Sequence, residues 1–222
     1  LLTAMIGFCD LLLLRHSPGD QSFTDIMQIK QNANRAANLV RQLLAFSRQQ
    51  TLQPRVIDIT ESLADILILL QRLIGAGISL KMHHGKDLGL VRVDQGQFEQ
   101  VIINLVVNAR DAINGNGEIL IKTDHKILKR PLVLEHDTIP AGTYVLIEVI
   151  DNGCGIAPQH RDRIFDPFFS TKEIGSGTGL GLATVQGIVT QTGGHIDVDS
   201  EIGIGTKFSI YLPVHQGVEE TL

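Results

Sequence analysis

Residues 101–112 read VIINLVVNARDA, an apolar run that contains two asparagines and an aspartate near its end. At helical spacing, Asn104, Asn108 and Asp111 stand at i, i+4 and i+7, so they share one face of a helix. The apolar side chains lie largely on the opposite face: Phe98, Ile102, Leu105 and Ala109. Because asparagine is a poor helix former and is costly to bury unpaired, this stripe indicates a wall of oxygen ligands that faces a site.

Amide and carboxylate oxygens suit Mg²⁺, which keeps several of its waters and binds phosphate oxygens. The alternative is structural, with the asparagine side chains capping the backbone of a neighbouring loop. We expect the helix to run from Asp94 to about Ile113, because Asp94 with Gln97 three residues later resembles a capping box.

A second signal is DNGCGI at residues 151–156, directly after an expected strand. Asp151 at a strand end can accept a hydrogen bond from an exocyclic amine. Gly153 and Gly155 allow the backbone to turn sharply and approach a flat ligand. An ordinary turn between a strand and a loop is the alternative, since Asp-Asn-Gly is common turn chemistry.

A third signal is GSGTGLGL at residues 175–182, which leads into an expected helix. Its glycine amides are free to line a phosphate, with a helix N-terminus behind them. Neither GxxxxGK[ST] nor GxGxxG fits this segment, and a flexible hinge is the alternative. The preceding segment RIFDPFFSTK, residues 163–172, predicts a mobile lid anchored by its phenylalanines, with Lys172 placed to reach a terminal phosphate or simply solvated.

The first 52 residues predict two helices, at 1–14 and about 24–50, joined by a turn at 16–20. The first is expected to be buried. Apolar or small residues of the second recur at alternating three and four spacing: Ile26, Ile29, Ala33, Ala36, Val40, Leu43 and Ser47. Two such helices cannot bury both apolar faces alone, so the hairpin either self-associates into a four-helix bundle or packs on the rest of its own chain.

Residues 53–216 predict a second unit of interleaved helices and strands. Helices are expected at 60–74, 94–113 and 182–192. Strands are expected at 78–82, 118–123, 144–150, 195–200 and 207–212, with a linker that runs into a strand at 53–58 and a loop at 126–142. The last two strands form an antiparallel hairpin, so the fold class is α+β: a mixed sheet covered by helices on one face.

The composition excludes several classes of protein. The net charge of −5 without a basic run argues against nucleic acid as a partner. Cys9 and Cys154 are the only cysteines and form no disulfide framework, which favours a reducing cytoplasm. The apolar residues 1–14 are too few to span a membrane, and any membrane anchor is expected further upstream.

These signals, in this order, resemble the GHKL ATP-binding module shared by gyrases and histidine kinases. The helical stripe resembles its N box, residues 151–156 its G1 box, 165–172 its F box, 175–182 its G2 box, and 203–206 its closing glycine motif. The resemblance covers about residues 94–212 and implies the Bergerat α/β sandwich. Within histidine kinases, the flanking helices are most similar to those of the hybrid cell-cycle kinases of alphaproteobacteria.

The resemblance implies an ATP and Mg²⁺ site. Asp151 is expected to bind the adenine amine with support from Thr206, and Asn108 to hold Mg²⁺ with Asn104 near the phosphates. The full expected nucleotide-binding set is Asn104, Asn108, Asp111, Asp151, Gly153, Gly155, Ile156, Phe165, Thr171, Lys172, Gly175, Gly177, Thr178, Gly179, Leu180, Gly181, Leu182 and Thr206.

The resemblance implies a sensor histidine kinase of a phosphorelay: a homodimer through the hairpin that passes the γ-phosphoryl to a histidine, then to a receiver aspartate or a phosphotransfer protein. The acceptor histidine is expected just before Leu1, because residues 1–4 with Ile6 and Gly7 resemble the segment that follows it in such kinases. His16 is no substitute, since a turn follows it instead of an acidic residue. Hydrolases of the gyrase type carry a glutamate where Asn104 stands, and an amide cannot accept the proton from water. A GHKL ATPase and a non-catalytic nucleotide-sensing dimerisation module remain the alternatives.

Overall fold

A computed structural model of the chain describes residues 1–47, 53–134, 137–172 and 178–217. These residues form two compact units, one with residues 1–47, 170–172 and Thr178, the other with residues 53–169 and 179–217. The domain boundary expected between residues 52 and 53 stays a prediction.

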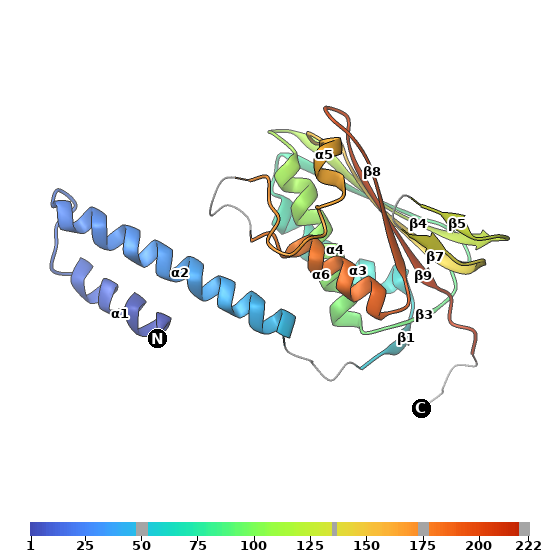
Figure 1. The fold of residues 1–222 in the computed structure, drawn as a ribbon, viewed down its shortest axis with the longest axis horizontal. Coiled ribbons are helices and arrows are strands. Elements are labelled where there is room, and N and C mark those ends of the chain that lie inside the picture. The colour runs from blue at the N-terminus through green and yellow to red at the C-terminus, as the bar shows by residue number, and fades with distance from the viewer. Residues whose placement is uncertain (48–52, 135–136, 173–177, 218–222) are drawn as a thin grey trace. The chain divides into compact units, whose positions relative to one another are not determined.

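The first unit contains a hairpin of two helices, α1 (Leu2–Leu13) and α2 (Gln21–Ser47) (Figure 1). Asp20 holds the turn, because one carboxylate oxygen accepts from the Ser22 N–H at 3.2 Å and the other lies 2.8 Å from His16 Nδ1. Lys30 Nζ lies 2.6 Å from Asp10 Oδ1, an ion pair that joins the helices. Across the described residues, no helix combines the length and the hydropathy that a membrane span requires.

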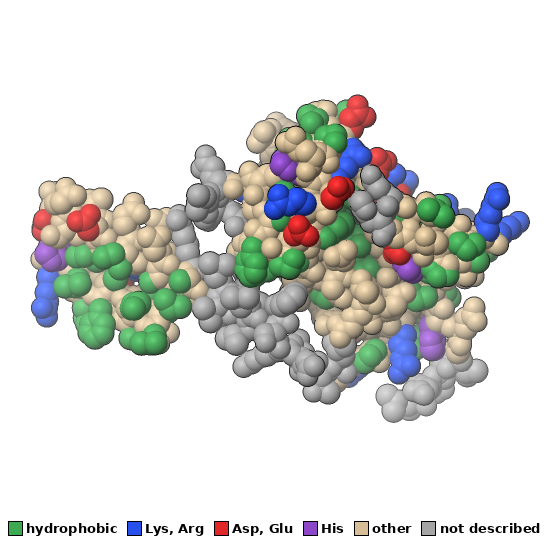
Figure 2. Space-filling view, in the orientation of Figure 1, with side chains coloured by type: hydrophobic (Ala, Val, Ile, Leu, Met, Phe, Trp, Pro, Cys, Tyr) green, Lys and Arg blue, Asp and Glu red, His purple; other side chains and the backbone are tan. Residues whose placement is uncertain are grey.

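The prediction that the first helix is buried is wrong for this chain. Only Cys9 of α1 is buried, and Figure 2 shows apolar side chains gathered on the hairpin. Among the described side chains of the hairpin, the large exposed apolar residues are Leu1, Met5, Phe8, Leu11, Leu12, Leu14, Met27 and Ile29. Since a helix can cover only one stripe of its neighbour, the remaining stripe stays exposed.

The seam predicted on the second helix is confirmed only in part. Ile26 and Ala33 are buried, Ala36 is half-buried, and Ile29 is exposed. The side chains of Val40, Leu43 and Ser47 lie outside the described residues. Ile29 belongs to the apolar surface of α2 that α1 leaves uncovered.

The second unit is built on a five-stranded sheet with the order β2-β4-β7-β9-β8. Its strands are β2 (Ile78–His84), β4 (Gly117–Leu128), β7 (Gly142–Asp151), β8 (His195–Glu201) and β9 (Gly205–Pro213). β2 pairs parallel to β4, and the other pairs are antiparallel. The predicted hairpin of the last two strands and the mixed sheet are therefore confirmed.

Three helices pack on one face of this sheet (Figure 1): α3 (Ile59–Ile74), α4 (Gln95–Ala112) and α6 (Gly181–Gln191). Alternation along β4 and β7 turns Ile119, Ile121, Val145 and Ile147 toward them, all fully buried. The predicted α+β sandwich with helices on one face is thus confirmed. The short helix α5 (Pro158–Arg161) lies in the connection from β7 to α6.

Aspartates begin the two long helices. The Asp94 side chain accepts from the Gln97 N–H at 3.1 Å and starts α4 where the capping pattern predicted it. Asp58 accepts from the Thr60 N–H at 2.7 Å and starts α3. Each carboxylate satisfies a backbone donor that the helix itself leaves unpaired.

The prediction of a loop at 126–142 is wrong. β4 continues to Leu128, and β5 (Leu132–Val133) pairs with β6 (Thr138–Ile139). Apolar residues of this segment form a second small core with Tyr144, Leu146 and Tyr211. A further strand, β3 (Val91–Val93), pairs with β1 (Arg55–Ile57). β3 was not predicted, because three residues are too short for an alternating pattern of apolar and polar side chains.

Candidate nucleotide-binding site

The polar stripe of α4 faces the first turn of α6. Asn104 and Asn108 are half-buried, and Asn104 Nδ2 donates to the Gly181 carbonyl at 3.4 Å. A Cβ at Gly181 would lie 3.7 Å from Asn108 Nδ2. The opposite face of α4 is buried as predicted, at Phe98, Ile102, Leu105 and Ala109. Asn104 therefore caps a neighbouring backbone, the alternative considered for it, while the stripe still borders the start of α6.

Asp111 lies at the end of this stripe and is held by its neighbour. Arg110 Nη2 and Nε lie 2.6 and 2.8 Å from the same oxygen, Asp111 Oδ1. The remaining guanidinium nitrogen of Arg110 donates to the Leu73 carbonyl on α3 at 3.0 Å. Asp111 is thus tied through Arg110 to α3, and its expected ligand role stays a prediction.

Asp151 ends β7 as a buried carboxylate. Its Oδ1 accepts from the Gly153 N–H at 2.8 Å, and the Thr206 N–H is a further backbone donor to it. Burial raises the pKa of the Asp151 carboxyl above its ordinary value, and these two N–H groups offset part of that rise. A buried acceptor at a strand end suits a ligand that brings its own N–H donor.

The loop after Asp151 is clamped from two sides. The Cys154 N–H donates to the Ala112 carbonyl at 2.9 Å, and the Cys154 carbonyl accepts from the Gly203 N–H at 2.9 Å. At Gly155 the φ angle is +74°, and a Cβ would lie 2.1 Å from the Glu201 carbonyl oxygen. The backbone can therefore run this close to the β8–β9 turn only because residue 155 has no side chain.

A backbone hydrogen bond joins Phe168 to Gly179, just before α6. The Phe168 N–H donates to the Gly179 carbonyl at 2.9 Å, and both residues have positive φ angles, of +67° and +66°. Leu180 is buried, and its carbonyl accepts from the Thr184 hydroxyl at 2.8 Å. The ends of the segment between Phe168 and Gly179 are therefore held together at the start of α6.

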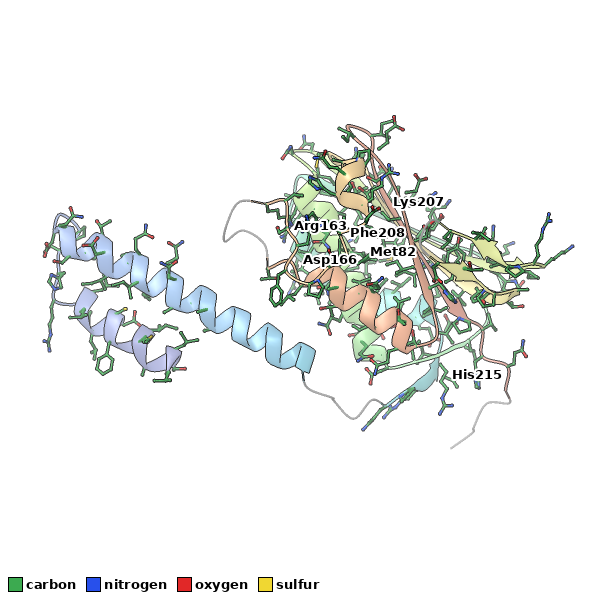
Figure 3. The ribbon with its side chains drawn as sticks, viewed as in Figure 1. Met82, Arg163, Asp166, Lys207, Phe208 and His215 are labelled. Carbon is green, nitrogen blue, oxygen red and sulfur yellow. The ribbon has the colours of Figure 1, made fainter. Side chains whose placement is uncertain are left out.

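Aromatic and charged contacts hold Phe165 and Phe169, whereas Phe168 is exposed, so the prediction that three phenylalanines anchor this segment is confirmed for two of them. The Phe165 ring meets Phe208 of β9 edge to face with centroids 6.5 Å apart. Arg163 stacks over the Phe169 ring at 4.6 Å and lies 3.6 Å from Asp166. Figure 3 shows Arg163 and Asp166 beside one another, with Phe208 close by on β9.

Part of the expected phosphate-binding set stays untested. Gly175 and Gly177 lie outside the described residues. Thr171 and Lys172 are exposed and belong to the first unit with Thr178, so their expected roles stay predictions. Gly179, Gly181 and Leu182 lie at the start of α6 as expected, with Leu182 half-buried.

Two polar residues of the site escaped the sequence reasoning. Asn152 Oδ1 accepts from the Glu118 N–H at 2.8 Å and fixes the start of β4. Ser200 lies buried on β8, where its hydroxyl accepts from the Ile156 N–H at 2.8 Å. The Asp-Asn turn chemistry could have indicated Asn152. Ser200 has only its place in the alternation of β8, which fixes the face and not the partner.

Residues 93–216 match the family described as "Histidine kinase-, DNA gyrase B-, and HSP90-like ATPase", which is more than half of the chain. The chain belongs to this ATPase family. The matched range contains α4, Asp151, α6 and Thr206, so the family assignment covers the site described above and confirms the resemblance inferred from the motifs.

Several relatives of the chain are sensor kinases. The chain is 56% identical over 212 residues to "Sensor kinase CckA" of Brucella abortus, which covers 96% of this chain and 22% of that protein. It is 30% identical to "Signal transduction histidine-protein kinase AtoS" of Escherichia coli, over 100% of this chain and 34% of that one. The chain thus spans about a fifth to a third of these curated relatives.

Solved structures of the family share the fold. The catalytic domain of histidine kinase ThkA has a TM-score of 0.57 at 26% identity and covers 73% of this chain and 96% of its own. Full-length ShkA in complex with AMPPNP has a TM-score of 0.68 at 23% identity, over 97% of this chain and 44% of that one.

The side chains of the site fit a magnesium ion that is shared with phosphate. The described residues contain no group of three or more His, Cys, Asp or Glu side chains that could hold a metal alone. The amides of Asn104 and Asn108 lie beside the start of α6 with their Nδ2 atoms on the side of Gly181, and each amide also carries an oxygen that Mg²⁺ can accept as a ligand. The N-terminal amides of α6 favour anions. Such a donor set suits Mg²⁺ only when phosphate oxygens and water complete its coordination.

Proposed function

We propose that this chain is the ATP-binding catalytic part of a sensor histidine kinase, with residues 53–216 as the nucleotide-binding domain and residues 1–52 as the dimerisation hairpin. One observation carries the proposal. In the residues matched to the ATPase family, a buried acceptor at Asp151 and an amide stripe beside the α6 N-terminus belong to the same unit. Adenine needs the first feature and a triphosphate needs the second.

The side chains divide the nucleotide between them. Asp151 accepts the adenine amine, with Thr206 beside it in the sheet register. Gly153 and Gly155 leave room for the flat base, and the N–H groups at the start of α6 bind phosphate oxygens. Asn108 holds Mg²⁺, which neutralises phosphate charge when it is bound.

Asn104 favours transfer of the phosphoryl group over its hydrolysis. An amide cannot accept the proton of an attacking water, and Asn104 donates to the Gly181 carbonyl. The γ-phosphoryl therefore passes to another nucleophile, a histidine nitrogen. The P–N bond forms as the bond to ADP breaks, and the group moves on to an aspartate of a receiver domain or to a phosphotransfer protein.

The hairpin supports dimerisation through its exposed apolar side chains. Phe8 and Met5 of α1 and Ile29 of α2 are 67%, 53% and 57% exposed. A contiguous apolar face of this kind on a two-helix unit is covered most simply by the same face of a second copy.

Radiolabel transfer tests the kinase proposal. The full-length protein is incubated with ATP labelled at the γ-phosphate, and the protein-bound label is then exposed to acid. We expect an acid-labile label and slow release of free phosphate. Rapid steady-state hydrolysis would support a GHKL ATPase instead, and nucleotide binding without label would support a sensing module.

Dimerisation is tested separately, by light scattering of the chain and of Phe8→Glu. We expect a dimer for the parent and a monomer for the variant, because a carboxylate in the apolar interface is costly to bury. Ile68→Glu is the control, since Ile68 is an exposed residue of α3 in the other unit. A dimer that survives Phe8→Glu contradicts an interface on this face.

A further inference from the structure

Three buried polar side chains form a row across the end of the sheet. Asp151 is the register partner of Thr206, and Thr206 is the register partner of Ser200, so the row crosses β7, β9 and β8. Their exposed fractions are 7%, 5% and 4%. Polar groups at this depth are hydrogen-bonded, so each hydroxyl proton needs a defined partner.

The Ser200 hydroxyl makes more contacts than its one proton can serve. It accepts from the Ile156 N–H at 2.8 Å and donates to the Gly205 carbonyl at 3.0 Å. Thr206 Oγ1 lies 3.0 Å away. A hydroxyl has one proton and two lone pairs, so a Ser200 that donates to Gly205 can only accept from Thr206.

The Thr206 proton is therefore committed to Ser200, and Thr206 offers only lone pairs to a ligand. Asp151, on the neighbouring strand, is also an acceptor. Two acceptors side by side match a purine that carries an amine at position 6. The two protons of a 6-amino group can serve both acceptors. A 6-oxo purine has one donor at this edge, its N1–H, so at least one of the two acceptors is left facing an oxygen or unpaired.

We propose that Ser200 is a positioning residue that fixes the direction of the Thr206 hydroxyl and so makes the site select 6-amino over 6-oxo purine nucleotides. This inference rests on the proposed nucleotide-binding function and adds the origin of its base selectivity. Ser200 touches no ligand in this account and acts through Thr206.

The surroundings of Ser200 hold it in one orientation. Arg161 of α5 donates from Nη2 to the Ser200 carbonyl, which ties the backbone of β8 to the segment after the loop. Gly205 runs so close to β7 that a Cβ would lie 1.9 Å from the Asp151 carbonyl oxygen. Thr206 Oγ1 is as near to the Ser200 hydroxyl as the Gly205 carbonyl, but all three contacts of Ser200 can be hydrogen bonds at once only if its proton points to Gly205.

The test compares the binding of ATP and inosine triphosphate, which carries a 6-oxo group, by calorimetric titration with Mg²⁺. We expect the parent chain to prefer ATP by at least about tenfold. In Ser200→Ala the Thr206 proton is free to donate to the oxo group, and the ATP:ITP affinity ratio should fall about fivefold, the value of one hydrogen bond. Ser200→Thr, which keeps the hydroxyl, should restore the parent ratio.

A second background separates this role from a merely structural one. In Thr206→Val there is no hydroxyl to orient, so adding Ser200→Ala should leave the ratio unchanged. An equal fall in both backgrounds would show that Ser200 acts through the Ile156 loop, and it overturns the proposal. Ser209→Ala is the matched control, because Ser209 is a buried serine on the other face of β9; it should keep the parent ratio.

Stability and the parent titration keep the outcomes distinct. If Ser200→Ala does not fold, Ser200→Cys carries the test, because a thiol of similar volume is a weak acceptor. A parent chain that binds neither nucleotide overturns the proposed function together with this inference. A parent chain that prefers ATP, with an unchanged ratio in Ser200→Ala, overturns this inference alone.

Discussion

The two ends of the candidate site are built in different ways. At the adenine end, Asp151, Thr206 and Ser200 are buried and bonded to one another's backbone or side chains. At the phosphate end, Asn104 and Asn108 are half-buried, and a long hydrogen bond of 3.4 Å joins Asn104 to α6. The first end is therefore the more buried and the more tightly hydrogen-bonded of the two.

This difference matches what each part of a nucleotide requires. A base is recognised by a fixed arrangement of donors and acceptors, so a rigid frame contributes to affinity and selectivity. A triphosphate that must be bound and then released as a diphosphate needs groups that adjust, and loops that cover phosphates commonly move on binding.

The largest expected effect is on stability, when a glycine at each end of the site is replaced by alanine. Gly155→Ala places a Cβ 2.1 Å from the Glu201 oxygen at a φ angle of +74°, so we expect about 3 to 4 kcal/mol of lost stability from strain and clash. Gly181→Ala meets Asn108 Nδ2 only at 3.7 Å, and we expect a change within about 0.5 kcal/mol. Urea unfolding measures both. Equal stabilities of the two variants would contradict a rigid adenine end.

Asn108→Ala comes next and tests the phosphate end. Removing a metal ligand should weaken Mg²⁺-dependent ATP binding by at least about 100-fold, beyond what loss of an outer-shell partner costs. Titration with Mg²⁺ and with a chelator measures it. Gln100→Ala is the control, because Gln100 is an exposed amide on the same helix. Unchanged metal dependence in Asn108→Ala counts against its role.

Asp151→Asn tests the acceptor of the adenine end. The new amide can turn a donor toward the adenine amine, so one charge-assisted hydrogen bond is lost and ATP affinity should fall about 10- to 50-fold. Binding of inorganic triphosphate, which has no base, should stay unchanged. If triphosphate binding falls as much as ATP binding, Asp151 acts on the structure of the site and not on the base.

The smallest expected effect is a pH dependence of stability. The folded-state pKa of Asp151 is raised above the ordinary value of 3.8. The folded protein therefore binds this proton more tightly, and the contribution of Asp151 to the free energy of unfolding falls as pH rises through the interval between the two pKa values. Asp151→Asn lacks this titration. Urea unfolding from about pH 3.5 to 7 should show the variant gaining on the parent as pH rises, and a loss would contradict it.

The sequence predicted the parts of the site that depend on local pattern. The one-sided spacing of Asn104 and Asn108 on an apolar helix and the Asp94 cap both follow from helix geometry, and both are found in the fold. Ser200 could not be predicted, because its partners Ile156 and Gly205 are brought to it only by the pairing of β8 with β9 and the clamped loop. The prediction that α1 is buried failed for a related reason. Apolar composition predicts that a face is covered, but it does not predict which molecule covers it.

The most direct test of the account is a crystal structure of the chain with magnesium and a non-hydrolysable ATP analogue. We predict the adenine amine within hydrogen-bonding distance of the Asp151 carboxylate, and Mg²⁺ coordinated by the Asn108 side chain and phosphate oxygens. An analogue bound elsewhere, or side chains packed into the space between Asp151 and the start of α6, would contradict the account.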